Sequence, residues 1–219
     1  EGIELHGAHG HLLAGFLSPL TNQRQDIYGG SFERRLTLPL NLIRRIREKV
    51  GREFVIGFRI SNEYTEGGLT REDIVKVAPI LDGTGLDYIH LGGGCFEAFK
   101  WLAPKGEGML LPDAKAIKEV VQGPVICPNV HDPLTGQSAL EEGIVDMISL
   151  SRGLLADPEW PNKAREGRFE DIRRCIYCNN CRIGFMSREA TEKRGAGLRC
   201  TVNPTLLREG EFELRPAPS

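Results

Sequence analysis

Residues 1–31 read EGIELHGAHGHLLAGFLSPLTNQRQDIYGGS, and this stretch contains three of the chain's five histidines. Small or polar residues alternate with apolar ones over residues 2–5, which predicts a short β-strand. The strand leads into a glycine-interrupted segment with His6, His9 and His11. Because glycine lets a backbone turn sharply beside a ligand, we expect His6 and His9 to point into the same space. The spacing alone is equally consistent with two capping or partly buried histidines.

Four further apolar segments have the length of strands, and helical periodicity follows each strand. We expect strands at residues 2–5, 54–60, 86–91, 124–127 and 145–150, and helices at residues 31–50, 70–81, 112–121, 134–142 and 158–165. Thr70 is the expected N-cap of its helix, and Pro39 predicts either a kink or a helix start. This alternation predicts an α/β fold with a parallel sheet, and it does not separate an open doubly wound sheet from a barrel.

Length and composition exclude several classes of protein. A chain of 219 residues with 40% hydrophobic and 26% charged residues is typical of one globular domain with a real core. Its formal net charge of −2 gives no electrostatic case for binding nucleic acid or an anionic membrane. No apolar run approaches the roughly 20 residues that span a bilayer. We therefore expect neither a nucleic-acid partner nor a membrane partner.

The cysteines divide into two isolated residues and one cluster. The isolated residues are Cys95 and Cys127, and the cluster is Cys175, Cys178, Cys181 and Cys200. Four thiolates can hold a [4Fe–4S] cluster or tetrahedral zinc. Three close cysteines with a remote fourth favour iron–sulfur over zinc, and a disulfide or redox switch comes third. We expect a reducing, cytoplasmic compartment, a polar loop at residues 187–197, and a core position for Cys127.

The opening stretch resembles the old yellow enzyme family. The residues that carry the resemblance are H-G-A-H-G-x-L-L, F-L-S-P and N-x-R-x-D-x-Y-G-G-S, with Glu33 and Arg35 after them. Together with CIxCNxC and a later C-x-x-N-P, they resemble the branch of 2,4-dienoyl-CoA reductase, 2-enoate reductase and trimethylamine dehydrogenase. The resemblance implies the C-terminal part, about strands 4 to 8, of an FMN-binding (β/α)8 TIM barrel, and hence a fragment. It divides the chain into a partial barrel over residues 1–168 and an iron–sulfur-binding segment with a tail over residues 169–219.

The same resemblance assigns catalytic roles. His6 and His9 would hydrogen-bond the carbonyl or another anionic group of the substrate above the flavin. The family usually has a tyrosine that often donates a proton where this chain has His11. Histidine can donate a proton near neutral pH, so His11 is the expected replacement. Phe96 stands where some dienoyl-CoA reductases carry a histidine that assists proton delivery.

Residues at the expected strand ends would bind FMN. Arg59 would stabilise negative charge on the N1 side of the reduced flavin, although a surface ion pair is the alternative for this arginine. Ser151 and Arg152 would hold the FMN phosphate, helped by the backbone around Asn129 and Val130. The resemblance also implies four cluster ligands: Cys175, Cys178, Cys181 and Cys200.

These assignments imply an FMN- and [4Fe–4S]-dependent oxidoreductase that reduces the activated C=C bond of an enoate or enoyl-CoA with electrons from NAD(P)H. FAD and NAD(P)H would bind a further C-terminal domain or a separate electron-transfer partner, and a homo-oligomer stays open. One alternative is an amine dehydrogenase of the same fold, although that branch usually has a tyrosine where His6 stands. A non-catalytic metal-binding or electron-transfer module is the alternative from a different class.

Overall fold

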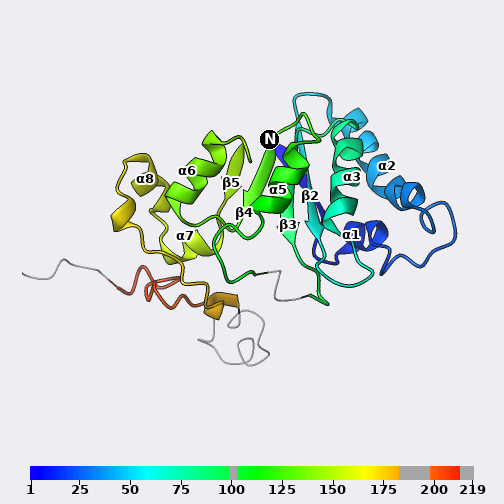
Figure 1. Ribbon diagram of the computed structural model, residues 1–219. Helices are drawn as coiled ribbons and strands as arrows, with labels where there is room; N and C mark the ends of the chain where they lie inside the picture. Colours follow the sequence, from blue (N-terminus) through cyan, green and yellow to red (C-terminus); the bar gives the residue numbers. More distant parts are fainter. Residues whose placement is uncertain (99–102, 183–197, 213–219) are drawn as a thin grey trace, which may run out of the picture. The chain divides into compact units, whose positions relative to one another are not determined.

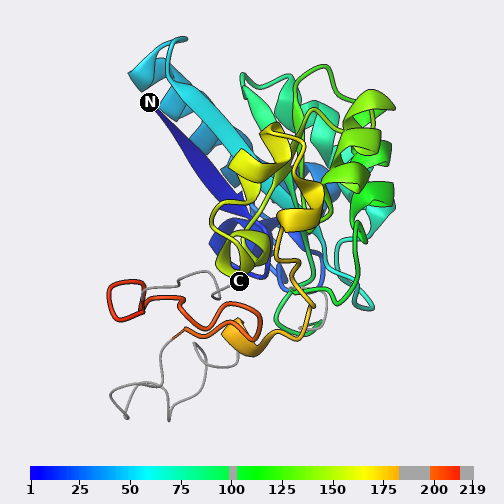
Figure 2. The same ribbon diagram turned by 90° about the vertical axis from the view of Figure 1, so that its left-hand side faces the viewer.

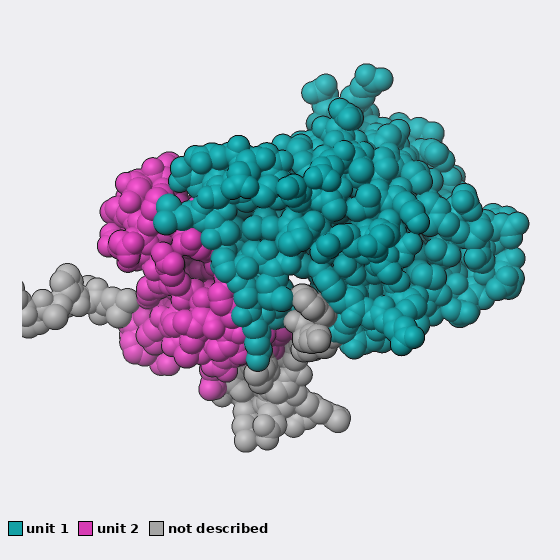
Figure 3. Space-filling model, viewed as in Figure 1, with its two compact units in different colours: residues 1–130, 134–149 teal, residues 131–133, 150–219 magenta. Residues whose placement is uncertain are grey.

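The computed structural model describes residues 1–98, 103–182 and 198–212 of the chain (Figure 1). Two compact units divide it: unit 1 comprises residues 1–130 and 134–149, and unit 2 comprises residues 131–133 and 150–219 (Figure 3). The loop expected at residues 187–197 lies outside the described residues. The division expected at residue 168 stays a prediction.

The described part of unit 1 is built around a parallel sheet. Its strands are β1 (Gly2–Gly7), β2 (Val55–Asn62), β3 (Tyr88–Gly93), β4 (Val125–Pro128) and β5 (Met147–Ser149). They lie side by side in chain order, and every neighbouring pair is parallel. A doubly wound sheet reverses its strand order at a switch point, whereas this order does not reverse. The topology therefore favours the succession of βα units found in a barrel.

A single histidine shows that the sheet curves. The imidazole of His90 on β3 lies 2.8 Å from Glu4 Oε2 on β1 and 2.9 Å from Ser149 Oγ on β5. In a flat sheet, four strand spacings would separate β1 from β5 by about 19 Å. One ring bridges both outer strands only because the sheet curls around the face that carries the ring. Unit 1 is therefore part of a barrel.

Helices cover the other face of the sheet (Figures 1 and 2). In unit 1 and at its margin they are α1 (Leu12–Leu17), α2 (Phe32–Val50), α3 (Arg71–Asp82), α5 (Leu111–Lys118) and α6 (Pro133–Glu141). The last four confirm expected helices, and α1 was not expected. The core between sheet and helices contains Ile43, Phe58, Ile74 and Leu81, all fully buried, and Cys127 packs there as expected.

Local signals explain where the two long helices begin. The Ser31 hydroxyl accepts a hydrogen bond from Arg34 N at 3.4 Å, so α2 starts before Pro39. Pro39 is buried inside α2, and the alternative of a helix start there is wrong. At α3, Thr70 Oγ1 accepts from Asp73 N at 3.2 Å while the Asp73 carboxylate accepts from Thr70 N at 3.0 Å. This capping box satisfies two backbone N–H groups and confirms the expected N-cap.

Unit 2 contains the short helices α7 (Arg152–Ala156) and α8 (Trp160–Arg165) and the 3-10 helix η1 (Phe169–Asp171). The helix expected at residues 158–165 corresponds to α8, and α7 was not expected. Asp157, between the two helices, is 1% exposed and accepts hydrogen bonds from Lys163 Nζ at 2.7 Å and Arg173 N at 2.9 Å. These bonds fasten the chain that leads to the cysteine cluster. Within the described residues, no helix has the length and apolarity needed to cross a membrane.

Candidate active site

Strand register gathers polar side chains on the concave face of unit 1. His6 on β1 is paired with Arg59 on β2, which is paired with His90 on β3. Glu4 precedes His6 by two positions and shares its face, because side chains alternate across a strand. We call the surface formed by Glu4, His6, Arg59, His90 and Ser149 the histidine face.

The turn after β1 brings the three expected imidazoles together. The His6 ring lies 5.1 Å from the ring of His9 and 4.8 Å from the ring of His11, between centroids. His9 has a left-handed backbone with φ 63°, and its N–H donates to Ser61 Oγ at 3.2 Å. A non-glycine residue rarely adopts this conformation unless its surroundings hold it. The structure thus places His6 and His9 in the same space, as expected, while their roles stay predictions.

Burial controls the protonation of His6. Burial lowers the pKa of His6, and the charges of Arg59 and His11 lower it further. The imidazole is therefore neutral at physiological pH, with one nitrogen donating and the other accepting. A neutral imidazole in this position can donate a hydrogen bond to a carbonyl or anionic oxygen.

Arg59 is half-buried in the centre of the histidine face. Its Nε is buried and has no hydrogen-bond partner among the described residues. Burial lowers the pKa of Arg59, and the nearby Glu4 carboxylate opposes that effect. Arginine nevertheless stays protonated in proteins. Among the described residues, no carboxylate forms an ion pair with Arg59, so the alternative of a surface ion pair does not fit. The buried Nε–H could instead donate a hydrogen bond to a bound ligand.

Gly92 gives the His9 and Arg59 side chains their space. A Cβ at Gly92 would lie 2.8 Å from His9 Nε2 and 3.5 Å from Arg59 Nε. The His9 and Arg59 side chains therefore occupy the space over β3 that any side chain at position 92 would fill. Beyond them, the ring of Phe96 is 53% exposed and lies 5.4 Å from the His11 ring. Phe96 thus forms an apolar edge beside His11.

Sequence reasoning missed three residues of this face, Glu4, His90 and Ser149, and the neighbouring Tyr88. The Tyr88 ring extends from β3 over Gly57 on β2, because a Cβ at Gly57 would lie 2.0 Å from Tyr88 Cζ. Burial raises the pKa of Glu4, but the His90 hydrogen bond and the His90 and Arg59 charges outweigh it, so the net pKa is lowered. The sequence signal that could have found them is the alternation of polar residues along a strand, since Glu4 and His6, like Tyr88 and His90, are two positions apart.

The two expected backbone positions after β4 belong to unit 1. Asn129 has φ 66°, and its Nδ2 donates to Gly106 O at 2.5 Å while its carbonyl accepts from Gly108 N at 3.0 Å. Val130 is fully buried in the core. The 106–108 loop therefore fixes Asn129, and Val130 anchors the backbone beside it.

The two expected phosphate-binding residues belong to unit 2. Ser151 is the N-cap of α7 without a side-chain capping bond, and Arg152 is the first residue of that helix. Arg152 Nη1 donates to Asn179 Oδ1 at 2.6 Å, and its guanidinium lies 5.5 Å from the centre of the Tyr177 ring. Tyr177 and Asn179 both have left-handed backbones, with φ 54° and 59°. Arg152 thus holds the loop between the first three cysteines of the cluster.

The cluster cysteines share one pocket of unit 2. Cys175, Cys178, Cys181 and Cys200 line it together with Arg152 and other residues, and the pocket is partly open to solvent. All four are free thiols. Cys178 Sγ lies 3.2 Å from Thr201 Oγ1, and this hydrogen bond is the main cause that lowers the Cys178 pKa. Burial raises the pKa of both Cys175 and Cys181.

Sharing a pocket is not the same as forming a metal site. Within residues 1–98, 103–182 and 198–212, no group of three or more His, Cys, Asp or Glu side chains has an arrangement that would hold a metal ion. The thiols therefore provide a suitable set of donors without ligand geometry. His6, His9 and His11 of unit 1 do not form a metal site either.

Comparisons with known proteins agree with the fold and the motifs. Residues 1–171 match the NADH:flavin oxidoreductase / NADH oxidase family. The chain is 46% identical to an NADH oxidase of Thermoanaerobacter brockii, covering 100% of this chain and 34% of that protein. It is 32% identical to a cinnamate reductase of Clostridium sporogenes, covering 99% and 35%. It therefore spans about a third of the length of these curated relatives.

A solved complex of 2-naphthoyl-CoA reductase with 2-naphthoyl-CoA has the same fold. It superposes with a TM-score of 0.84 at 30% identity, over 94% of this chain and 31% of that one. The family match covers most of the chain and includes the curved sheet and the three-histidine turn. The chain belongs to the NADH:flavin oxidoreductase / NADH oxidase family, to which the old yellow enzymes belong.

Proposed function

We propose that this chain serves an FMN-dependent oxidoreductase that reduces the activated C=C bond of an enoate or enoyl-CoA. The observation that carries the proposal is the histidine face, where neighbouring His6 and His9 rings lie beside a half-buried arginine. Imidazole N–H groups and a guanidinium are the groups that stabilise a developing negative charge on oxygen. A cinnamate reductase and a 2-naphthoyl-CoA reductase among the relatives support this substrate class.

The residues of the histidine face fit a flavin. The buried Nε–H of Arg59 has no acceptor among the described residues, so a negatively polarised ring atom would satisfy it. FMN, when bound, supplies the hydride. His6 and His9 donate hydrogen bonds to the substrate carbonyl oxygen, which draws electron density away from the C=C bond. His11 then delivers a proton to the other carbon.

We propose that Ser151 and Arg152 hold the FMN phosphate, with the backbone at Asn129 and Val130 helping. A guanidinium that pairs with two phosphate oxygens is a strong and specific contact. The fixed conformation of Asn129, bonded to Gly106 and Gly108, supports a preformed backbone site.

We further propose that Cys175, Cys178, Cys181 and Cys200 hold a [4Fe–4S] cluster. Their shared pocket supports this assignment, and four thiolates match the chemistry of the cluster. Their present separations do not match ligand geometry. Metal sites commonly assume their geometry only when the metal binds, so the ligand set is the stronger criterion. Electrons would come from NAD(P)H through an FAD-containing domain or partner, in a reducing compartment such as the cytoplasm.

The amine dehydrogenase alternative is less well supported. A neutral imidazole at His6 donates to a carbonyl oxygen, whereas that branch usually has a tyrosine at this position. Assays of the same preparation with enoates and with methylated amines separate the two functions.

The deciding experiment substitutes the histidine pair in the complete protein that contains this chain. His6→Ala/His9→Ala should abolish binding of phenolic or enoate ligands, measured by calorimetry. His6→Asn/His9→Asn keeps an N–H donor group on each side chain and should retain part of the binding. Unchanged binding in the alanine variant contradicts the proposal. An anaerobic visible spectrum, with flavin, iron and sulfide quantified, should show about four irons per chain.

A further inference from the structure

The histidine face contains a carboxylate that the proposed chemistry does not use. Glu4 lies on β1, two positions before His6, and its side chain is 29% exposed. It is the acidic residue whose charge acts on both Arg59 and His6. A negative charge beside a site for developing negative charge opposes that site's purpose, so it needs an explanation.

The contacts of Glu4 hold it in place from two sides. Glu4 Oε2 lies 2.8 Å from His90 Nδ1, and His90 Nε2 lies 2.9 Å from Ser149 Oγ. A carboxylate accepts, so His90 Nδ1 carries a proton and donates to Glu4. Tyr88 reaches Glu4 from the other side across Gly57, and burial with the Glu4 charge raises the pKa of Tyr88 to about 12. Glu4 therefore stays ionised in one fixed position.

We propose that Glu4 is a positioning residue that balances the charge of Arg59 and so limits how tightly the histidine face binds anions. This inference rests on the proposed function. Interactions that bind substrate, product and transition state equally do not speed the chemical step. Without a counter-charge, the field of Arg59 would attract the carboxylate of an enoate and of its saturated product equally, with no gain in the chemical step. Glu4 weakens that uniform attraction, while Arg59 still stabilises the charge that develops during reaction.

The effect of removing the charge has the opposite sign from the effect of damaging the site. Glu4→Gln keeps the size of the side chain and an acceptor for His90, and removes one negative charge. Because Glu4 is partly exposed, a dielectric constant near that of water applies, and removing one unit charge about 4 Å from an anion then changes its affinity by about fivefold. The anion 4-nitrophenolate should therefore bind about fivefold more tightly to Glu4→Gln. A purely structural role for Glu4 predicts weaker binding.

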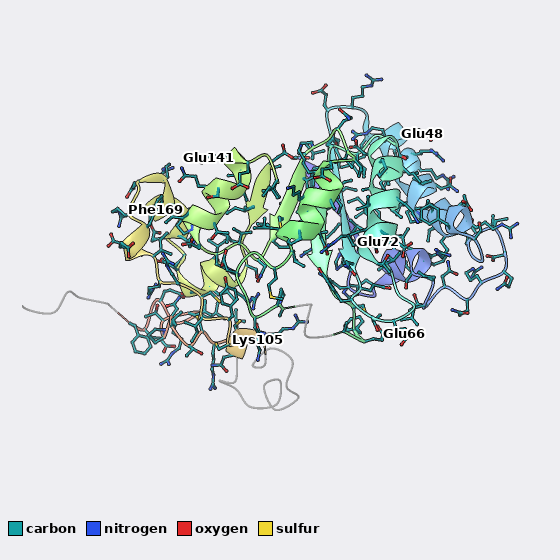
Figure 4. All side chains as sticks on the ribbon, in the orientation of Figure 1. Glu48, Glu66, Glu72, Lys105, Glu141 and Phe169 are labelled. Atoms are coloured by element: carbon teal, nitrogen blue, oxygen red, sulfur yellow. The ribbon has the colours of Figure 1, made fainter. Side chains whose placement is uncertain are left out.

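The experiment uses the flavin-loaded complete protein and 4-nitrophenol at a pH where its yellow colour shows it to be the phenolate. Glu4→Gln and Glu4→Ser, both neutral, should both tighten binding and raise the midpoint potential of the flavin. Two neutral variants guard against one that fails to fold, and the partial exposure of Glu4 favours folding. Glu4→Asp keeps the charge and should bind like wild type. The matched control is Glu48→Gln on the outer end of α2 (Figure 4), which should change neither quantity.

The outcomes separate the two proposals. If wild type binds 4-nitrophenolate, and the His6→Ala/His9→Ala variant does not, the histidine site stands. Equal or weaker binding by the neutral Glu4 variants then overturns the charge-balancing role alone. If wild type binds neither flavin nor 4-nitrophenolate, both the proposed function and this inference fail.

Discussion

The histidine face of unit 1 and the cysteine pocket of unit 2 are organised in different ways. On the histidine face, each side chain starts from a strand position fixed by backbone pairing, and His90 is bonded at both ring nitrogens. In the cysteine pocket, three of the four thiols belong to a loop with left-handed residues at Tyr177 and Asn179. The described residues alone position the side chains of the first arrangement, whereas the second has no metal-ligand geometry within them.

The difference shows two ways of encoding a site. Strand register positions side chains without help from a ligand, because a shift of one residue would turn every side chain to the other face. A cysteine cluster supplies donors whose geometry forms together with the metal. Single substitutions on the histidine face should therefore weaken ligand binding in part. A single substitution of a cluster cysteine should abolish metal binding.

The largest expected effect is loss of the cluster. Cys181→Ser in the complete protein should reduce bound iron and sulfide from about four per chain to near zero, because a [4Fe–4S] cluster needs all four of its cysteine ligands. Flavin content should persist. Cys127→Ala, a buried cysteine outside the pocket, is the matched control and should keep its iron. Full iron content in Cys181→Ser would show that Cys181 is not a ligand.

The next effect is acid sensitivity from unit 2. Burial first, and then the Arg152 charge, lower the pKa of His131 from 6.5 to about 4. A depressed folded pKa means that the unfolded chain takes up the proton first as pH falls. The stabilising contribution is complete above pH 6.5 and is lost as pH falls towards 4, by up to about 3 kcal/mol.

Urea unfolding at several pH values tests this prediction. Trp160 Nε1 donates to His131 O at 2.8 Å, so its fluorescence reports the surroundings of His131. His131→Phe keeps a ring 5.1 Å from Tyr177 and cannot titrate, so the loss of stability between pH 6.5 and 4 should shrink. An unchanged slope in this variant would assign the acid sensitivity to other groups.

Most of the fold, and only part of the site, could be predicted from the sequence. The long helices and all five strands were predictable because periodicity and caps such as Thr70 are local signals. The helices α1 and α7 have six and five residues, too short for a periodic pattern. Glu4 and His90 were missed because their contact joins residues 86 positions apart and depends on register and curvature. Local sequence carries neither quantity, just as it carries no distance between the cysteines.

A third substitution tests how rigidly register fixes the histidine face. The Cβ of Gly57→Ala would lie 2.0 Å from Tyr88 Cζ and 2.5 Å from its hydroxyl oxygen. The ring must move off β2, and such overpacking costs about 2 kcal/mol of unfolding free energy. The matched control is Gly15→Ala in α1, where the nearest atom is 3.8 Å away, and it should be neutral or stabilising. Equal stability of the two variants in urea would mean that Tyr88 adapts freely.

The smallest expected effect is the most specific, because it separates binding from stability. The Cβ of Gly92→Ala would meet His9 Nε2 at 2.8 Å and Arg59 Nε at 3.5 Å. Both are near the ends of flexible side chains, so they can move at little cost in unfolding free energy. Their displacement from the ligand should nevertheless weaken binding of a phenolate about tenfold, since misplaced donors lose most of their value. Calorimetric binding and urea unfolding on the same sample decide the point. Weakened binding at full stability would show that the absent side chain at position 92 is part of the site, whereas a parallel loss of both would make Gly92 a packing requirement of β3.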